Sequence, residues 1–250
     1  MSIRTHGGHG SQVYDAGVGA NVAGGVSARL DWRTLSALAG LDERSLRASC
    51  TRRRFDRGDI IFHEGDPAGA LHLLDKGRVA VRLTTPLGDV GTIDVLQEGD
   101  TFGEQALIDG VGERTATIAA LEKVEVLALD VTSFEQLRAA HPVVDRFLLM
   151  VVSARLRATS HQLLDALYLP ADVRVLRCVA RLHVTFGAEP GASIPLTQTD
   201  IAAMAGVTRS TANRLLQNAQ SDGLLHVSRA HIDVLDGDRL RRLAGLGARP

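Results

Sequence analysis

The spacing of apolar residues changes along the chain, and each change predicts a different kind of structure. Between residues 52 and 129, short apolar and β-branched runs alternate with turns that contain glycine. The runs lie at 60–62, 71–74, 79–83, 92–96, 115–118 and 124–127. Many short strands separated by closely spaced turns are typical of a small all-β unit. This part of the sequence therefore predicts a barrel, a sandwich or a roll.

A long helix is predicted after these strands, from residue 133 through residue 169, with Pro142 at a break or a new first turn. Within it, apolar residues recur at steps of three and four, as in the seam of a coiled coil. The seam consists of Leu149, Val152, Leu156, Thr159, Leu163 and Ala166. We expect residues 143–168 to form a parallel homodimer; a helix buried within one chain is the alternative.

The segment 196–216 is predicted to form two short helices joined at Gly206. Thr197 and Asp200 have the spacing of a capping box, and Thr208 is placed to cap the second helix. This pattern is typical of a helix-turn-helix, although an ordinary helical hairpin shares it. Runs at 223–228 and 232–235 then predict a β-hairpin, or wing.

Composition narrows the class of protein. The 250 residues carry 28 Lys and Arg against 29 Asp and Glu, so any surface for nucleic acid must be local. The two cysteines, Cys50 and Cys178, are far apart, which argues against a disulfide framework, a zinc site or an iron–sulfur cluster. We expect no metal, and we expect His63 and His72 to be surface or turn residues rather than haem ligands. No apolar run approaches the length of a membrane span, so we expect a cytoplasmic protein.

The two ends of the chain differ in character. Residues 1–29 are rich in glycine and poor in large apolar residues, which predicts a flexible N-terminal extension. Residues 170–250 contain no P-loop, no metal-ligand spacing and no set of nucleophile, base and orienting residue. We therefore do not expect an enzyme.

A candidate ligand site lies between residues 102 and 118. Glu104 follows a glycine in a predicted turn, and Arg114 with Thr115 is predicted to open a new strand. A carboxylate can accept hydrogen bonds from ribose hydroxyls, and an arginine beside hydroxyl and backbone donors suits a phosphate. These residues favour a sugar phosphate over an apolar ligand.

The pair Gly103 and Glu104, followed ten residues later by Arg114 and Thr115, resembles the phosphate-binding cassette of cyclic-nucleotide-binding domains. The order of β-roll, cassette, long helix and helix-turn-helix is similar to that of the CRP/FNR family of transcription regulators, above all its cyclic-AMP receptor members. The resemblance covers roughly residues 30–236. It implies an α+β fold with a cyclic-nucleotide-binding β-roll (jelly-roll) at 30–132, a dimerisation helix at 133–169 and a winged helix-turn-helix domain at 170–250.

The resemblance also implies an allosteric effector, cyclic AMP. The residues that would hold it are Gly103, Glu104, Gln105, Ala106, Arg114, Thr115, Thr159 and Ser160. In the family, a Thr-Ser pair at this place in the long helix contacts the adenine, and one hydroxyl reaches across the dimer. The alternative for Thr159 is a hydrogen bond to a carbonyl of its own helix. Gln105 stands where the cassette usually has an apolar residue. Cyclic GMP, another effector or no effector remains an alternative to cyclic AMP.

The partners that the resemblance implies are a pseudo-palindromic DNA operator and RNA polymerase. The residues that would contact DNA are Gln198, Thr199, Thr208, Arg209, Ser210, Thr211, Asn213 and Arg214. An arginine fork on guanine is the commonest specific base contact in such complexes. Ser210 stands where the cyclic-AMP receptor pattern has a glutamate that would accept from cytosine, so we expect base discrimination there to weaken or change.

Overall fold

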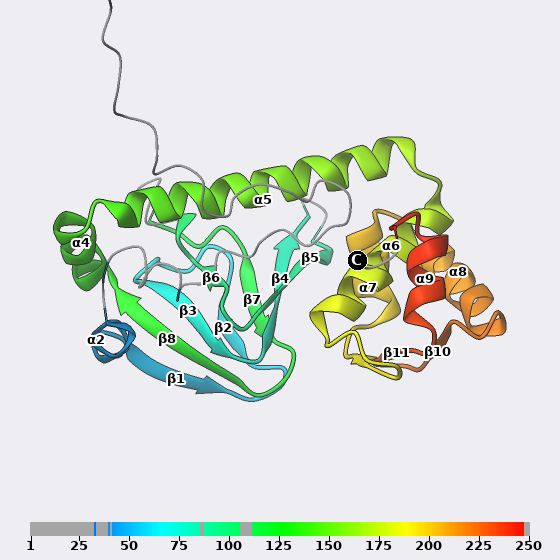
Figure 1. The fold of residues 1–250 in the computed structure, drawn as a ribbon, viewed down its shortest axis with the longest axis horizontal. Coiled ribbons are helices and arrows are strands. Elements are labelled where there is room, and N and C mark those ends of the chain that lie inside the picture. Colours follow the sequence, from blue (N-terminus) through cyan, green and yellow to red (C-terminus); the bar gives the residue numbers. More distant parts are fainter. Residues whose placement is uncertain (1–32, 34–39, 41, 86–87, 106–111, 248–250) are drawn as a thin grey trace, which may run out of the picture.

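The computed structural model describes residues 33, 40, 42–85, 88–105 and 112–247. The strands between residues 51 and 130 form a β-roll, and the elements between residues 171 and 243 form a compact C-terminal head. A long helix runs along one side of the roll and ends beside the head (Figure 1). The α+β architecture expected from the sequence is thereby confirmed.

Two four-stranded antiparallel sheets make up the roll. One has the strand order β1 (Thr51–Phe55), β8 (Val124–Asp130), β3 (Ala70–Lys76), β6 (Thr101–Phe102). The other has the order β2 (Ile60–Phe62), β7 (Thr117–Ala120), β4 (Arg78–Thr84), β5 (Val90–Gln97). Each predicted strand is present, but β7 begins at Thr117, so Arg114 and Thr115 lie just before the strand and do not open it. The side chains buried between the sheets include Leu74, Val79, Phe102, Ile118 and Val126.

The predicted long helix is two helices, α4 (Val131–Ala140) and α5 (Val143–Tyr168), with Pro142 at the N-cap of the second. The first half of α5 is held against the roll by apolar side chains, as are α4 and the short helix α2 (Glu43–Ala48). The contributing residues of α5 are Val144, Phe147, Leu148 and Val151. Among the described residues, no helix is both long and apolar enough to cross a membrane.

The head contains the predicted helix-turn-helix. Its helices are α6 (Ala171–Thr185), α7 (Gln198–Ala205), α8 (Arg209–Ser221) and α9 (Gly237–Leu243). Its small sheet has the order β10 (Leu225–Val227), β11 (Ile232–Val234), β9 (Ser193–Ile194). Thr197 and Asp200 form a capping box at the start of α7, and Gly206 ends that helix at φ 62°, which glycine adopts without steric cost. Thr208 accepts the Thr211 amide at 3.2 Å and so caps α8 as predicted.

The head and the roll share one hydrophobic core. The roll contributes Ala80, Val95 and Leu121 to the apolar cluster of the head. Beside this core, Arg78 of β4 donates from Nε to the Thr185 carbonyl at 2.8 Å, and its guanidinium lies over the Phe186 ring at 4.7 Å. The head is therefore packed onto the second sheet of the roll as well as joined to it by the chain.

Candidate functional site

Glu104 lies two residues after the end of β6 and is fully buried. Its Oε1 accepts a hydrogen bond from Nη1 of Arg155, while its Oε2 is buried without a partner in the described part of the chain. A buried carboxylate is costly unless each oxygen finds a donor. One oxygen of Glu104 is therefore available to a hydroxyl group of a ligand.

Arg155 was not among the residues predicted for this site. It lies on α5, and besides Glu104 it donates from Nη2 to the carbonyl of Thr101 on β6. This guanidinium therefore connects the long helix to the predicted cassette. The sequence did contain a signal for it, because Arg155 precedes Thr159 by four residues and so lies on the same face of the helix.

Arg114 is the second buried charge of the site. Its Nη1 donates to the Gly103 carbonyl at 3.1 Å and its Nη2 to the Ala70 carbonyl at 2.9 Å, and its guanidinium lies 4.2 Å from the centre of the Phe62 ring. Within the described residues its Nε has no hydrogen-bond partner and no carboxylate forms an ion pair with it. Burial lowers the pKa of Arg114, and the nearby carboxylates oppose that change only in part. A buried cation without a paired carboxylate is suited to an anionic ligand.

Gly103 allows Arg114 to take this position. Its φ is +80°, a conformation that residues with a side chain rarely adopt. A Cβ atom at residue 103 would also collide with Nη1 of Arg114. Glycine is therefore required here both by the backbone and by the close approach of the guanidinium.

The remaining residues of the predicted cassette are placed only in part. Thr115 Oγ1 donates to Gln105 Oε1 at 2.8 Å, and this hydrogen bond joins the two arms of the cassette. Both side chains are exposed, so Gln105 does not require an apolar environment. Ala106 lies outside the described residues.

A histidine close to the site differs from the expectation. His72 on β3 is buried, not at the surface, whereas His63 is exposed as predicted. The His72 ring stacks on Phe102 at a centroid distance of 5.0 Å. Burial, followed by the nearby Arg114 and Arg53 cations, lowers the pKa of His72 to about 3. The side chain is therefore neutral and forms part of the aromatic layer behind Arg114. Alternation along β3 explains the error, because His72 faces the inside of the roll opposite Phe102.

Thr159 and Ser160 are exposed on α5. Ser160 Oγ donates to the Leu156 carbonyl at 2.9 Å, a bond within its own helix of the kind that was the alternative for Thr159. In the described part of the chain, no hydrogen bond joins either hydroxyl to the cassette. Arg155, about one helical turn earlier, makes that connection instead.

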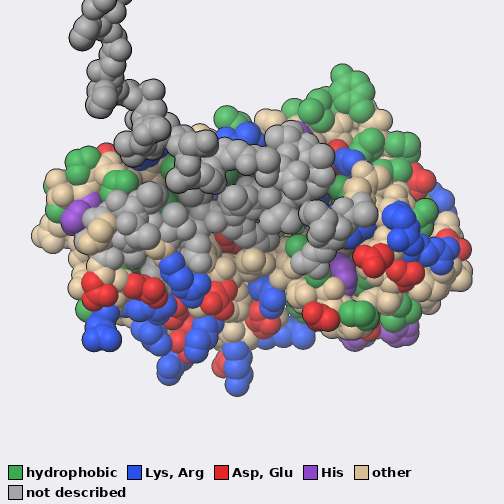
Figure 2. All heavy atoms as spheres, viewed as in Figure 1, with side chains coloured by type: hydrophobic (Ala, Val, Ile, Leu, Met, Phe, Trp, Pro, Cys, Tyr) green, Lys and Arg blue, Asp and Glu red, His purple; other side chains and the backbone are tan. Residues whose placement is uncertain are grey.

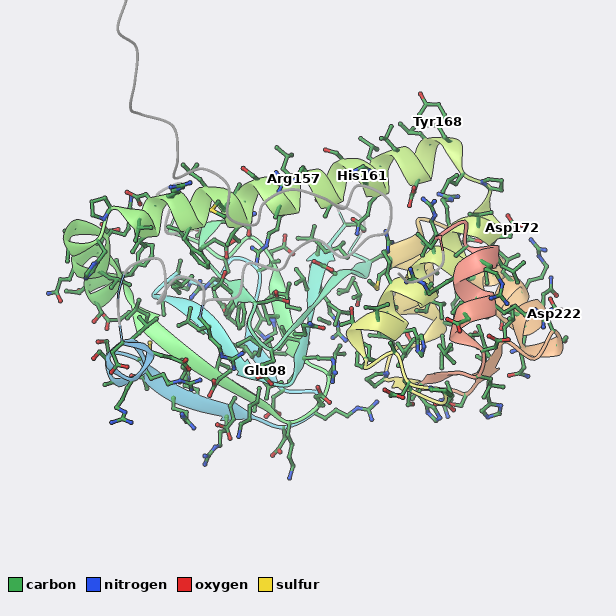
Figure 3. All side chains as sticks on the ribbon, in the orientation of Figure 1. Glu98, Arg157, His161, Tyr168, Asp172 and Asp222 are labelled. Carbon is green, nitrogen blue, oxygen red and sulfur yellow. The ribbon has the colours of Figure 1, made fainter. Side chains whose placement is uncertain are left out.

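The seam of α5 is not buried within one chain. Leu149, Leu156 and Leu163 are 68%, 66% and 59% exposed. Further exposed apolar residues continue to the end of the helix, where Tyr168 projects away from the rest of the molecule (Figure 3). Figure 2 shows hydrophobic side chains at the surface in this region, at the upper right of the molecule. A stripe of this kind indicates a surface that associates with another apolar surface.

The second helix of the helix-turn-helix, α8, has one buried and one polar face. Ala212, Leu216 and Ala219 are buried in the head. The predicted DNA-contacting residues on the opposite side are exposed: Arg209, Ser210, Asn213 and Arg214. Of the other predicted contacts, Thr199 is exposed at the start of α7, Gln198 and Thr211 are half-buried, and Thr208 is the N-cap of α8.

Comparisons with known proteins agree with this arrangement. The family model for the cyclic nucleotide-binding domain matches residues 52–141, and the model for the Crp-like helix-turn-helix domain matches residues 173–243. The chain is 30% identical over 193 residues to the cyclic AMP receptor protein of Thermus thermophilus, covering 77% of this chain and 88% of that protein. It is 28% identical over 194 residues to the CRP-like cAMP-activated global transcriptional regulator of Mycobacterium tuberculosis, covering 76% and 86%.

A solved structure supports the fold. The c-di-GMP responsive global regulator CLP of Xanthomonas campestris aligns with a TM-score of 0.65 and 22% identity, over 77% of this chain and 97% of that one. A nucleotide-binding roll followed by a Crp-like helix-turn-helix defines a cyclic-nucleotide-binding transcription regulator that is not an enzyme. The chain belongs to the CRP/FNR family.

Proposed function

We propose that this regulator binds cyclic AMP as its allosteric effector, at Glu104 and Arg114. One observation carries the proposal: Glu104 and Arg114 are buried charges of opposite sign that do not pair with each other, and among the described residues neither Oε2 of Glu104 nor Nε of Arg114 has a hydrogen-bond partner. A ligand with a hydroxyl group on one side and an anion on the other satisfies both. Cyclic AMP has this chemistry, and its ribose and phosphate are fused in a single rigid group. Two relatives are named for cyclic AMP, which supports this choice.

The roles of the site residues follow from this assignment. Glu104 accepts the ribose 2′-hydroxyl, and Arg114 with Thr115 donates to the cyclic phosphate. Gly103, Gln105 and Ala106 complete the cassette. Thr159 and Ser160 receive the adenine from the exposed face of α5.

The regulator acts as a parallel homodimer through residues 143–168. The exposed stripe on α5 supports this pairing, because leucines left in water at intervals of seven residues cost solvation free energy that a partner helix recovers. Each protomer comprises a roll at 30–132, the helical segment 133–169 and a head at 170–250. Two heads related by a twofold axis match the two halves of a pseudo-palindromic operator. RNA polymerase is the further partner through which transcription changes.

Ligand binding is coupled to the dimer through Arg155. Because Arg155 holds the carboxylate that would accept the ribose, occupancy of the cassette changes a contact made by the long helix. The long helix leads directly into the head through residues 169–170. Coupling of this kind is typically 1–3 kcal/mol and is reciprocal, so operator DNA and cyclic AMP each tighten the binding of the other by the same factor.

Calorimetry with cyclic AMP, 2′-deoxy cyclic AMP, cyclic GMP and c-di-GMP tests the effector. We expect cyclic AMP to bind with the highest affinity, the 2′-deoxy analogue to lose at least tenfold, and Arg114→Leu to abolish binding. Arg44→Leu, at an exposed arginine outside the site, is the matched control and binds normally. Tighter binding of another nucleotide, or normal cyclic AMP affinity in Arg114→Leu, would overturn the assignment.

A further inference from the structure

We propose that Asn213 selects an adenine in each operator half-site, and that Ser210 takes no part in base reading. The proposal rests on the DNA-binding role given above to α8, and it specifies how that helix distinguishes one operator from another. Three observations carry it: the position of the Ser210 hydroxyl, the freedom of the Asn213 amide, and the rotation of α8 about its axis.

The Ser210 hydroxyl is held at the start of its own helix. Its Oγ lies 3.0 Å from Oγ1 of Thr208, the N-cap residue. Thr208 Oγ1 is in turn 2.9 Å from Thr211 Oγ1 and accepts the Thr211 amide at 3.2 Å. A serine side chain is also too short to extend far beyond the helix backbone. The hydroxyl therefore belongs to the cap, and it does not replace the longer carboxylate that the family pattern has at this position.

The Asn213 side chain is in the opposite situation. It is exposed, and no hydrogen bond of its amide is found in the part of the chain that the structure describes. The same is true of Arg209 and Arg214, whose guanidinium groups form no ion pair with any described carboxylate. By contrast, the arginines of the neighbouring helix α6 are anchored, for example Arg177 to Asp165 at 2.6 Å. Three unanchored polar side chains are thus available to a ligand on the exposed side of α8.

The buried face of α8 fixes which residues point outward. Ala212 and Leu216 are fully buried, so the helix cannot rotate without exposing them. Asn213 follows Arg209 by four residues and therefore lies on the same face. A carboxamide offers one acceptor and one donor side by side, which matches N6 and N7 of adenine in the major groove. The flanking arginines have the fork geometry that matches O6 and N7 of guanine.

Selection from a randomised half-site library tests the proposal. The full-length protein with cyclic AMP is compared with Asn213→Ala and Ser210→Ala, and the affinities of the selected site and its single-base variants are then measured. We expect the wild-type site to contain an adenine for which Asn213→Ala loses its preference by roughly tenfold or more, with preferences elsewhere kept. Ser210→Ala should select the same site and bind it within about twofold. Both substitutions introduce alanine on an exposed helix face, where it favours the helix.

The outcomes separate this proposal from the function on which it rests. An Asn213→Ala variant that keeps every base preference would overturn it. So would a uniform loss of affinity across all sequences, because that is the behaviour of a phosphate contact. A changed base preference in Ser210→Ala would overturn the second part. If the wild-type protein selects no sequence at all, the operator-binding function itself is wrong.

Discussion

Thr92 on β5 donates from Oγ1 to Oδ1 of Asp200 on α7, at 2.6 Å. This hydrogen bond joins the roll to the first turn of the helix-turn-helix. Thr92 is buried, and Oδ2 of the same carboxylate accepts the Thr197 amide and hydroxyl of the capping box. One side chain therefore both starts α7 and attaches it to the roll, beside the place where Gly91 approaches Ala203. A change in the roll can pass to the head at this point.

The first prediction follows from this contact. Thr92→Val removes the donor but keeps the shape of the side chain, and hydrogen bonds to charged groups contribute about 1.5–3 kcal/mol. With cyclic AMP as the proposed effector, we expect the factor by which it raises operator affinity to fall toward one, by roughly threefold or more, because the two parts are no longer held in a fixed relation. Fluorescence anisotropy with labelled operator, with and without nucleotide, measures that factor. Thr51→Val, an exposed threonine on β1, is the control and should keep it. An unchanged factor in Thr92→Val would show that this contact carries no coupling.

The second prediction concerns Arg155. Arg155→Leu leaves the carboxylate of Glu104 buried without a cation, and breaking a buried pair in this way costs on the order of 3–5 kcal/mol. We expect the free energy of unfolding to decrease by about 3 kcal/mol. This is the lower end of that range, because the Arg155 side chain is itself 32% exposed. Urea unfolding followed by circular dichroism measures it. Arg157→Leu, two residues along the same helix and labelled in Figure 3, is the matched control and should cost little.

A double variant tests the cause of that loss. Adding Glu104→Gln to Arg155→Leu removes the unpaired charge, so stability should partly recover. Nucleotide affinity should not recover, because the amide oxygen of glutamine is a weaker acceptor for the ribose hydroxyl than the carboxylate that it replaces. The alternative outcome is that Glu104→Gln lowers the stability of Arg155→Leu by as much as it lowers that of the wild type. The ion pair is then not what stabilises α5 on the roll.

How far the sequence predicted these features depends on the range of the interactions. The capping box of Thr197 and Asp200 is a local pattern, and it was predicted because every group involved lies within one helical turn. The link from Asp200 to Thr92 crosses 108 positions and leaves no periodic trace in the sequence. Helical spacing places Arg155 on the same face as Thr159, but its pairing with Glu104 could not be predicted, because it depends on how α5 lies across the roll. Glu104 and Arg114 were chosen for their chemistry, but their burial became known only from the packing around them.

The third prediction is a dependence of stability on pH that arises from His72. Burial lowers the pKa of His72 to about 3, below the ordinary value of 6.5, so the folded protein holds this ring neutral while the unfolded chain takes up a proton below that value. Its contribution to stability is complete above pH 6.5 and is lost as the pH falls toward 3, by about 1.4 kcal/mol per unit. In His72→Phe, which keeps an aromatic ring against Phe102, the loss between pH 7 and pH 5 should be smaller than in the wild type. Urea midpoints at several pH values measure the difference. Equal slopes for the two proteins would mean that His72 is protonated as readily in the folded state as in the unfolded one.

The fourth prediction concerns the exposed stripe on α5. Leu156 and Leu163 are 66% and 59% exposed in the single chain, so their replacement by glutamate removes little packing within a protomer. In a parallel pair of helices, each glutamate would face its own copy across the seam, where two like charges and the loss of apolar contact both oppose association. We therefore expect Leu156→Glu/Leu163→Glu to be a folded monomer by sedimentation velocity, with circular dichroism close to that of the wild type.

The consequence for DNA separates pairing through α5 from other modes of association. A monomer engages one half-site at a time, so operator affinity should fall by at least a hundredfold while the weak affinity for a single half-site is kept. His161→Glu introduces the same charge on the same helix, two residues beyond Thr159 of the seam, and should remain dimeric (Figure 3). If the double variant remains dimeric and keeps normal operator affinity, the protomers do not pair through α5. Thr159 and Ser160 would then lack the partner helix across which the adenine contact is proposed.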